Sequence, residues 1–372
     1  MRLGVAAVEE PVEQADDWIW MVDHSNQIGP EKVLCILGVR ASLLPPPGTP
    51  LKHKDMRVLA VQPGTKWKRE DMAKVYEELA ERIGPPRAVL SDGAVELREG
   101  AEGLKTKGND TIVLRDFKHF AANQMESLIG KNPRFKKFGK EIGLTRSKIQ
   151  QTELAHLTPL SLKPKSRFMN LSANLHWAGM ALWLLDHPDC ESRRELNAER
   201  VEAKLGWLRD YAEELSAWQA CQDVVSRSLS FLNEHGVFRG VSACLKSLLS
   251  ESQSHSLSRQ LAHRLIRFVQ DAEAQVREGE RLPISTEILE SSFGLYKQLE
   301  GQQAKGGFTS LLAAFGALLK PATPESIRGA FSRMKTKDVN QWIKQHLGET
   351  LTARRRFAYH EYKSATKQLT TA

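Results

Sequence analysis

The chain has 372 residues, of which 41% are hydrophobic and 26% are charged, a composition typical of a globular protein with one to three domains. It contains no apolar run of about 18 residues, so no transmembrane helix is predicted, and its first residues lack the apolar block of a secretory signal. Its four cysteines are widely separated, which predicts buried thiols in a reducing cytoplasm and argues against a zinc site or a disulfide framework.

The charge of the chain is unevenly distributed. The formal net charge is +8, yet residues 131–167 hold ten Lys or Arg against two acids, and residues 320–372 hold eleven against four. The rest of the chain is therefore net negative. Two basic zones on an otherwise acidic chain indicate surfaces that contact a polyanion, with nucleic acid as the expected partner; ordinary solvated faces are the alternative.

The N-terminal third alternates between strand and helix patterns. Short apolar runs predict five strands, and apolar residues at three- and four-residue spacing predict three helices. The predicted strands cover residues 18–22, 32–42, 56–61, 88–90 and 111–114, and the predicted helices cover residues 72–83, 95–105 and 119–129.

The order of these elements predicts an α/β fold. The first three strands are joined by short links, including a hairpin at residues 26–30 that contains Gly29 and Pro30, and should be antiparallel. The later strands are joined through helices and should be parallel. A mixed five-stranded sheet of this kind has the RNase H-like order.

A long helical stretch should interrupt this sheet domain, because strand patterns are missing from about residue 131 to residue 280. Its four tryptophans lie on apolar stripes, which predicts that they pack in the core. Four segments in it show helical periodicity: Leu171–Leu185, Glu199–Glu214, Trp218–Leu232 and Leu257–Val276. The predicted domains are an RNase H-like core (15–130), an all-helical insertion (131–280), the last helices of the core (281–320) and a basic helical tail (321–372).

Two aspartates each follow an apolar strand. Asp23 ends the run WIWMVD, and Asp92 follows AVLS. Because catalytic and ligand groups of open α/β sheets collect at the carboxyl ends of strands, both are candidate catalytic acids. A structural role, in which the carboxylate caps the following turn or helix, is the alternative.

The third candidate acid is Glu290, in the helical segment STEILESSFGLYK. Glu290, Gly294 and Lys297 share one side of this predicted helix, so a glutamate, an open position and a lysine would line the same surface. Glu287 lies one turn earlier and is the rival acid. An exposed helix with a regular charge pattern is the alternative to a catalytic role.

Together these segments resemble the DDE transposases of bacterial insertion sequences. The likeness rests on WIWMVDHS, AVLSDG and ILESSFGLYK and covers about 280 residues. The spacing from Glu290 to Lys297 is similar to the end of the family signature Y-x2-R-x3-E-x6-K, but Thr286 stands at the Arg position and the Tyr half is also missing. Because Asp23 is close to the first residue, we expect no separate N-terminal end-recognition domain. Either another part of the chain would bind the terminal repeats, or the element would be truncated or split.

The resemblance implies a two-metal mechanism. Asp23, Asp92 and Glu290 would bind two Mg²⁺ or Mn²⁺ ions, and Lys297 would contact a phosphate. Water would be the nucleophile for strand cleavage, and a DNA 3′-hydroxyl the nucleophile for strand transfer. The implied partners are transposon ends and target DNA, bound by a homodimer in a paired-end complex at the nucleoid in the cytoplasm.

Two other functions fit the same residues. One is a catalytically inactive DNA-binding relic or regulator, and the other is an RNase H-like nuclease that cuts without joining ends.

Further candidate residues have structural alternatives. Asp116 with His119 could steer a metal or phosphate, but capping of the next helix is favoured. His24 should point away from Asp23, since neighbouring strand residues face opposite sides. Residues 140–156 resemble a helix-turn-helix, with basic helices of the insertion favoured instead. The run Arg354, Arg355 and Arg356 is either a phosphate-binding arm or a solvated tail.

Overall fold

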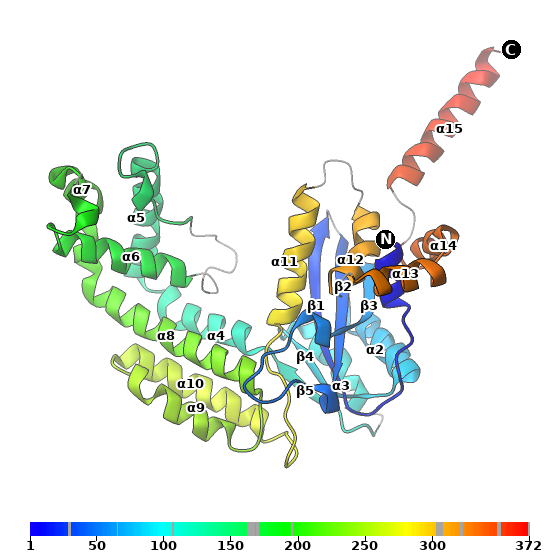
Figure 1. The fold of residues 1–372 in the computed structure, drawn as a ribbon, viewed down its shortest axis with the longest axis horizontal. Helices are drawn as coiled ribbons and strands as arrows, with labels where there is room; N and C mark the ends of the chain where they lie inside the picture. The colour runs from blue at the N-terminus through cyan, green and yellow to red at the C-terminus, as the bar shows by residue number, and fades with distance from the viewer. Residues whose placement is uncertain are drawn as a thin grey trace. The chain divides into compact units, whose positions relative to one another are not determined.

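The structure is a computed structural model that describes residues 1–28, 31–64, 66–105, 108–161, 168, 171–194, 196–302, 308–319, 323–347 and 351–370. Two compact units divide the chain. Residues 1–116 and 284–372 form the sheet unit, and residues 117–283 form the helical unit (Figure 1). The segment 117–130, predicted as core, lies in the helical unit, and the predicted tail at 321–372 is grouped with the sheet unit.

A mixed five-stranded sheet in the order β3-β2-β1-β4-β5 forms the centre of the sheet unit. Neighbours β1–β2 and β2–β3 are antiparallel, whereas β1–β4 and β4–β5 are parallel. This is the RNase H-like topology, so the predicted fold class is confirmed. The strands are β1 (Trp18–Ile28), β2 (Glu31–Arg40), β3 (Arg57–Gly64), β4 (Pro86–Ser91) and β5 (Ile112–Arg115).

The first strand runs further than the sequence pattern predicted. It continues past Asp23 to Ile28, because β2 stays paired with it in a hairpin whose last described pair is Ile28 with Glu31. The polar side chains after Asp23 hid this extension, since ladder hydrogen bonds do not require an apolar pattern. The predicted link at Gly29 and Pro30 lies outside the described residues.

Helices pack on both faces of the sheet. Trp18, Trp20 and Val22 of β1 join a buried cluster with α2 (Arg69–Ile83) and α3 (Val95–Lys105). Side chains alternate along a strand, so Ile19 and Met21 face the other side, and α11 (Glu287–Gln302) packs against β1. Figure 1 shows α11 beside β1.

A layer of C-terminal helices adds to the sheet unit. It contains α12 (Phe308–Leu318), α13 (Pro324–Arg333) and α14 (Thr336–His346), and α15 (Leu351–Thr370) follows. The N-terminal helix α1 (Arg2–Val8) was not predicted from sequence. It packs against α12, α13 and α14, with Val5 buried beside Trp342 and Ile343.

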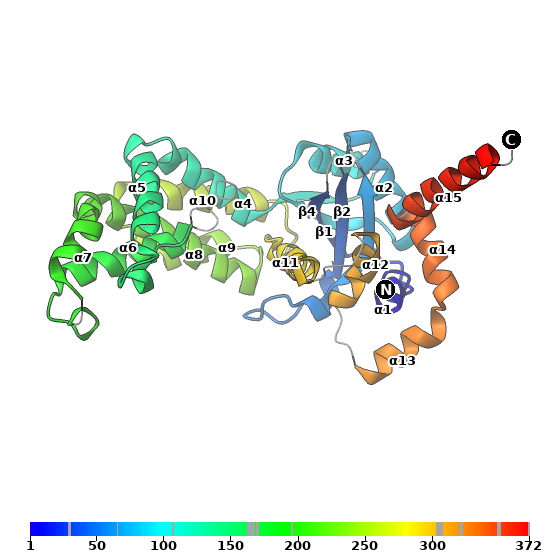
Figure 2. The same ribbon diagram turned by 90° about the horizontal axis from the view of Figure 1, so that it is seen from above.

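The described part of the helical unit contains no strand, as the sequence predicted; its one isolated bridge pairs Val237 with Leu282. Its α-helices, seen from above in Figure 2, are α4 (Phe117–Met125), α5 (Pro133–Ile149), α6 (Leu171–Asp186), α7 (Ala198–Leu205), α8 (Ala212–His235), α9 (Val241–Leu249) and α10 (Ser256–Glu273).

Three expectations for this unit need correction. The helix predicted at Glu199–Glu214 is interrupted by a 3-10 turn from Gly206 to Tyr211. The resemblance of 140–156 to a helix-turn-helix fails, because α5 runs without a break through Gly143. Trp183 is 50% exposed and stacks on His187, so it is not a core residue, whereas Trp177 and Trp218 are buried.

None of the described residues belongs to a helix that is both long and apolar enough to cross a membrane. The cysteines are free; Cys35 and Cys221 are buried as predicted, but Cys244 is exposed.

The close approach of α1 and α12 yields a stability prediction. A Cβ atom on Gly4 would meet the backbone carbonyl of Ala313 well inside van der Waals contact, whereas a Cβ on Gly329 of α13 would meet nothing within 4 Å. Gly4→Ala should therefore lower the free energy of unfolding by about 1–3 kcal/mol. Gly329→Ala should raise it by about 0.5–1 kcal/mol through helix propensity. Urea denaturation measures both, and equal effects of the two substitutions would contradict the packing described.

Candidate active site

The two candidate aspartates lie on adjacent parallel strands at matching positions. Val22 of β1 is in register with Ser91 of β4, and the next residue on each strand is an aspartate. Paired strands are about 4.8 Å apart, so Asp23 and Asp92 are neighbours across the sheet. Both residues are half-buried. The structure thus brings together two acids that are 69 positions apart in the sequence.

Asp23 lies inside β1, not at its end. It pairs with Cys35 of β2, and alternation puts it on the same face as Ile19 and Met21, where α11 packs. Its Oδ1 accepts a hydrogen bond of 2.7 Å from the backbone N–H of His24.

Asp92 lies where β4 stops. Gly93 follows with a φ of 92°, and α3 begins at Val95. The Asp92 Oδ1 accepts a hydrogen bond of 2.8 Å from the backbone N–H of Ala94. One carboxylate oxygen of Asp92 therefore caps the following turn, which is the structural alternative to a catalytic role.

His24 points away from Asp23, as the alternation of a strand predicts. Its ring stacks on Trp67 with centroids 5.6 Å apart, and its Nδ1 lies 3.6 Å from a carboxylate oxygen of Glu96 on α3. Only 8% of the His24 side chain is exposed. It belongs to the face of the sheet that α2 and α3 cover.

A buried aspartate anchors the helix that carries Glu290. Asp116 directly follows β5 and is 0% exposed. Its Oδ2 accepts hydrogen bonds from the backbone N–H of Thr286 at 2.5 Å and from the Thr286 hydroxyl at 2.9 Å. Its own backbone N–H donates to the carbonyl of Ser91 at 2.7 Å. Asp116 therefore ties the start of α11 to the end of β4, one residue before Asp92.

Glu290 lies in the first turn of α11. Its backbone N–H donates to the Thr286 carbonyl at 3.0 Å, so its position follows directly from the Asp116 anchor. Glu290 is half-buried, and its Oε1 is a buried atom. Glu287 is also half-buried, and it lies further round the helix from the buried residues Leu289 and Phe293.

Nearby titratable groups report concentrated negative charge at this edge of the sheet. Burial raises the pKa of the Tyr76 hydroxyl, and the carboxylates of Asp92 and Glu96 raise it further. Burial also raises the pKa of the Cys35 thiol far above its usual value, with Asp23 adding to the effect. Asp92 and Glu96 thus act on a group of the face that α2 and α3 cover, and Asp23 acts on its cross-strand neighbour Cys35.

The described residues include no group of three or more His, Cys, Asp or Glu side chains arranged to hold a metal ion. The carboxylates of Asp23 and Asp92 instead accept backbone N–H groups next to them. Like charges at adjacent positions repel, and local amide donors relieve this repulsion. The donor set itself, carboxylate oxygens on neighbouring elements, fits Mg²⁺ or Mn²⁺.

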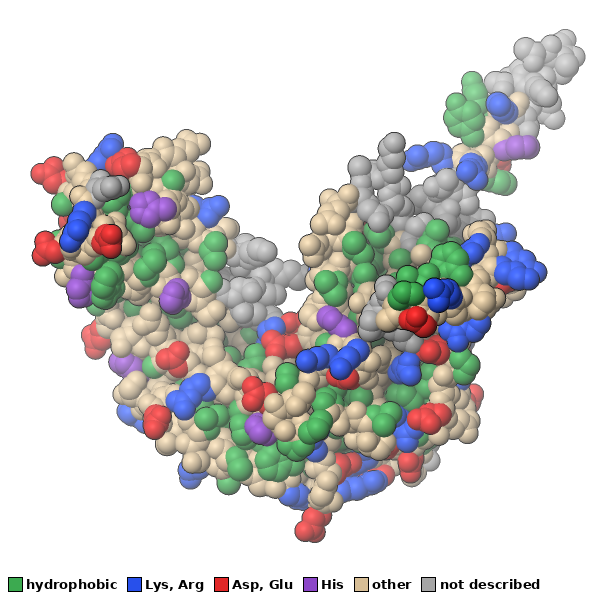
Figure 3. Space-filling model, viewed as in Figure 1, with side chains coloured by type: hydrophobic (Ala, Val, Ile, Leu, Met, Phe, Trp, Pro, Cys, Tyr) green, Lys and Arg blue, Asp and Glu red, His purple; other side chains and the backbone are tan. Residues whose placement is uncertain are grey.

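The predicted phosphate-contacting residues are exposed. Lys297 lies two turns after Glu290 along α11. Arg354, Arg355 and Arg356 are exposed on α15, as are Phe357, Tyr359 and Tyr362. Figure 3 shows hydrophobic and basic side chains together on the described part of this helix. The arginine run is therefore part of a helix rather than an irregular arm.

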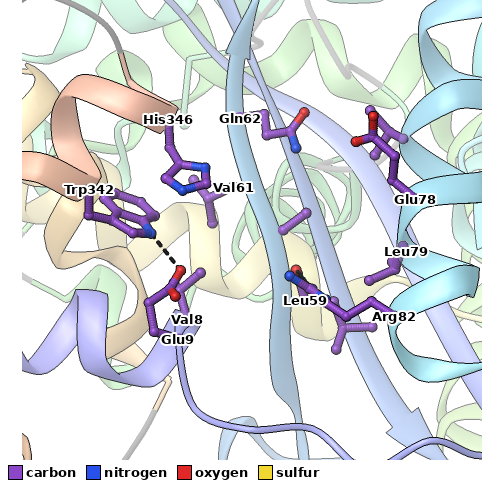
Figure 4. Close-up of a pocket in the computed structure, with 12 residues that line it drawn as sticks. Val8, Glu9, Leu59, Val61, Gln62, Glu78, Leu79, Arg82, Trp342 and His346 are labelled. Atoms are coloured by element: carbon purple, nitrogen blue, oxygen red, sulfur yellow. Dashed lines mark hydrogen bonds between the residues drawn. The ribbon is translucent and has the colours of Figure 1, made fainter. Parts of the chain in front are cut away.

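A cavity of about 240 Å³ lies elsewhere in the sheet unit, between β3, α1, α2 and α14 (Figure 4). The Trp342 Nε1–H donates to Glu9 at 2.8 Å beside it, and Arg82 donates to the carbonyl of Leu59 on the edge strand β3 at 2.7 Å. The candidate acids are not among the residues that line it. These contacts cover a strand edge that could otherwise pair with another chain.

Neither the models of known protein families nor the sequences of curated proteins match this chain. The site must therefore be interpreted from its own residues.

Sequence reasoning missed the role of Asp116. The sequence favours a role for Asp116 in capping the helix that follows it. The partner that the structure shows, Thr286, is 170 positions away, and no local pattern indicates it. One signal was available: Asp116 follows a strand at the same sheet edge as Asp92, where carboxylates collect.

The anchor yields a second stability prediction. Asp116→Ala should lower the free energy of unfolding by about 2–4 kcal/mol, because it leaves the buried N–H and hydroxyl of Thr286 without their acceptor. Thr286→Val removes only the hydroxyl and should lower it by about 1 kcal/mol. Asp16→Ala, at an exposed position of the same unit, should change it by less than about 0.5 kcal/mol. Urea denaturation followed by circular dichroism tests this order; an Asp116→Ala variant as stable as Asp16→Ala would contradict the anchor.

His24 yields a prediction about pH. Burial lowers the pKa of His24, although the Glu96 carboxylate opposes the shift. As the pH falls below about 6.5, the unfolded chain takes up a proton that the folded protein resists, so the free energy of unfolding falls until the folded pKa is passed. His24→Gln should flatten this dependence between pH 7 and 5, whereas His360→Gln, at an exposed position, should leave it unchanged. Parallel slopes for the wild type and His24→Gln would show that His24 is not the cause.

Proposed function

We propose that this chain is a DDE-type DNA transposase whose catalytic acids are Asp23, Asp92 and Glu290. The observation that carries the proposal is the convergence of three segments at one sheet edge. Asp23 and Asp92 occupy matching positions on adjacent parallel strands, and Asp116 ties the first turn of α11 to the strand end beside Asp92. The RNase H-like topology supports the proposal, because transposases of the family that the sequence resembles carry their acids on these elements.

The three acids would hold two Mg²⁺ or Mn²⁺ ions. When bound, such ions activate the attacking oxygen and stabilise the leaving oxygen of a phosphodiester. The chain contributes position: β1 and β4 hold two carboxylates side by side, and the anchored helix holds the third. Lys297 would contact a DNA phosphate from the same helix. Water and a DNA 3′-hydroxyl would supply the reacting oxygens, so the chain need not supply a covalent nucleophile.

Glu290 is the better third acid on two grounds. Its Oε1 is buried, whereas Glu287 is turned further from the packed side of α11. Its amide bonds directly to Thr286, the residue that Asp116 holds. A catalytic carboxylate must be held in place, and the buried Oε1 of Glu290 lies closer to the packed side of α11 than the carboxylate of Glu287 does.

The proposed partners are transposon ends and target DNA, engaged at the nucleoid by a homodimer in a paired-end complex. The basic residues Lys297, Arg354, Arg355 and Arg356 are exposed and suited to phosphate contacts.

A DNA-binding protein without catalysis is the second candidate. The observation that favours it is the absence, among described residues, of a converged ligand set, together with the local hydrogen bonds that Asp23 and Asp92 accept. This protein would bind DNA but neither nick nor join it.

Conservative amide substitutions test the proposal. Asp92→Asn keeps an acceptor for the Ala94 N–H but removes the charge that a metal ion needs. It should lower Mn²⁺-dependent nicking of a duplex by at least about a hundredfold, equivalent to about 2.7 kcal/mol, and leave DNA affinity and thermal stability unchanged. Asp71→Asn is the matched control, because Asp71 accepts a backbone N–H near the start of α2 and is exposed.

The same assay separates the two glutamates and the rival functions. Glu290→Gln should lose nicking as Asp92→Asn does, and Glu287→Gln should retain most of it. A wild type that binds DNA without nicking it would favour the second candidate, and nicking that Asp92→Asn leaves intact would refute the assigned acids. Nicking without strand transfer would indicate an RNase H-like nuclease.

A further inference from the structure

Helix α5 of the helical unit has one face fixed in an aromatic core. Its residues Phe135, Phe138, Ile142, Thr145 and Ile149 are buried at the three- and four-residue spacing of one helix face. Phe135 and Phe138 each pack on Trp218, with ring centroids 5.1 and 5.2 Å apart. The Trp207 Nε1–H also donates to the Thr145 hydroxyl at 2.9 Å. The orientation of α5 within its unit is therefore well defined.

The opposite face of α5 is lined with lysines. Its charged residues are all exposed and all positive: Lys136, Lys137, Lys140 and Lys148. Between them lie Gly143, Leu144 and Ser147, also exposed, and a Cβ on Gly143 would meet nothing within 4 Å. Glu141 is the one acid of the helix, and it is half-buried at the margin of this face. This set of four lysines is called the α5 lysine face below.

The two arginines of α5 have structural roles and are not part of this face. Arg134 pairs with Glu214 at 2.6 Å and lies over the ring of Tyr211, and its pKa is raised by the bond to Glu214. Arg146 donates to the carbonyl of Pro159 at 2.7 Å. Within the part of the chain that the structure describes, the four lysines make no ion pair. Their charge is therefore not compensated by the fold.

The α5 lysine face is long enough to contact several phosphates of a duplex. From Lys136 to Lys148 the helix rises about 18 Å at 1.5 Å per residue. A duplex carries one phosphate charge per about 1.7 Å of its axis when both strands are counted, so a straight face of this length can contact several phosphates. Lysine acts as a compact point charge toward phosphate, and the face has no Arg, Asn or Gln to bind base edges in pairs. Such a surface binds the backbone without selecting a sequence.

We propose that the α5 lysine face is a non-specific docking surface for the backbone of double-stranded DNA. The proposal rests on the proposed function for the identity of the substrate, and it places part of DNA binding on the helical unit, apart from the catalytic acids. A preordered helix loses little conformational entropy when it binds, which favours a contact made by one rigid face.

Salt dependence of binding tests this surface. The full-length chain carrying K136Q, K137Q, K140Q and K148Q is titrated with a 30-base-pair duplex of random sequence, without divalent metal, over a series of KCl concentrations. The slope of log K against log salt is negative, and each lost phosphate contact reduces its magnitude by about 0.9, so the magnitude should fall by roughly 2–4. Affinity at about 0.1 M salt should fall at least tenfold. Thermal stability should stay the same, because these side chains are exposed.

The matched control removes four other exposed cations from the same unit: R239Q, K246Q, R259Q and R267Q. It changes the net charge equally and should reduce the magnitude of the slope by less than about 1. Equal losses in both quadruple variants would mean that only net charge matters, and the proposal would be wrong. The wild type is also titrated with polyglutamate. If it binds polyglutamate as tightly as the duplex and the α5 variant does not, the face binds an acidic protein instead.

The outcome is separable from that of the proposed function. If the wild type nicks DNA and the α5 variant keeps its full salt slope, the docking surface is refuted and the proposed function is not. A wild type that binds without nicking, and whose α5 variant loses the slope, refutes the transposase activity and keeps the docking surface.

Discussion

The hydrogen bonds of Asp116 hold the candidate site together. A fully buried carboxylate is stable only when donors compensate its lost hydration, and here Thr286 supplies two of them while the Asp116 amide binds the end of β4. The helical unit leaves the sheet unit just after Asp116 and returns just before Ile284. The same bonds therefore close the long connection through the helical unit. Because the entropy of closing a loop grows slowly with its length, a few buried bonds can hold the ends together.

The carboxylates at this edge of the sheet lower the stability of the fold, because their negative charges repel one another. The apolar strands β1 and β4 bring Asp23 and Asp92 side by side, and Glu96 of α3 lies near His24 on the other face of β1. Repulsion between such groups opposes folding, and the backbone N–H groups of His24 and Ala94 offset part of it. This electrostatic cost is part of the case for the proposed function, in which cations would neutralise the two aspartates.

The sequence predicted the sheet well because its strands are apolar runs between clear breaks, and parallel or antiparallel pairing follows from the length of the links. It placed Asp92 correctly at the end of a strand for the same reason, whereas Asp23 lies inside β1 rather than at its end. Its failures concern contacts without a periodic pattern: the extension of β1 beyond Asp23 through polar residues, and the bond from Asp116 to Thr286 across 170 positions. The short helix α1 was missed because seven residues hold too few apolar repeats to identify a helix.

In the proposed function, DNA binding and phosphodiester chemistry would have opposite electrostatic requirements and would fall on different units. The sheet edge gathers carboxylates, which repel a phosphate backbone unless cations neutralise them, while the lysines of α5 attract that backbone without any metal. Separate surfaces also explain how a chain with net charge +8 can keep an acidic site, because its positive charge is concentrated in two zones that exclude the strand ends.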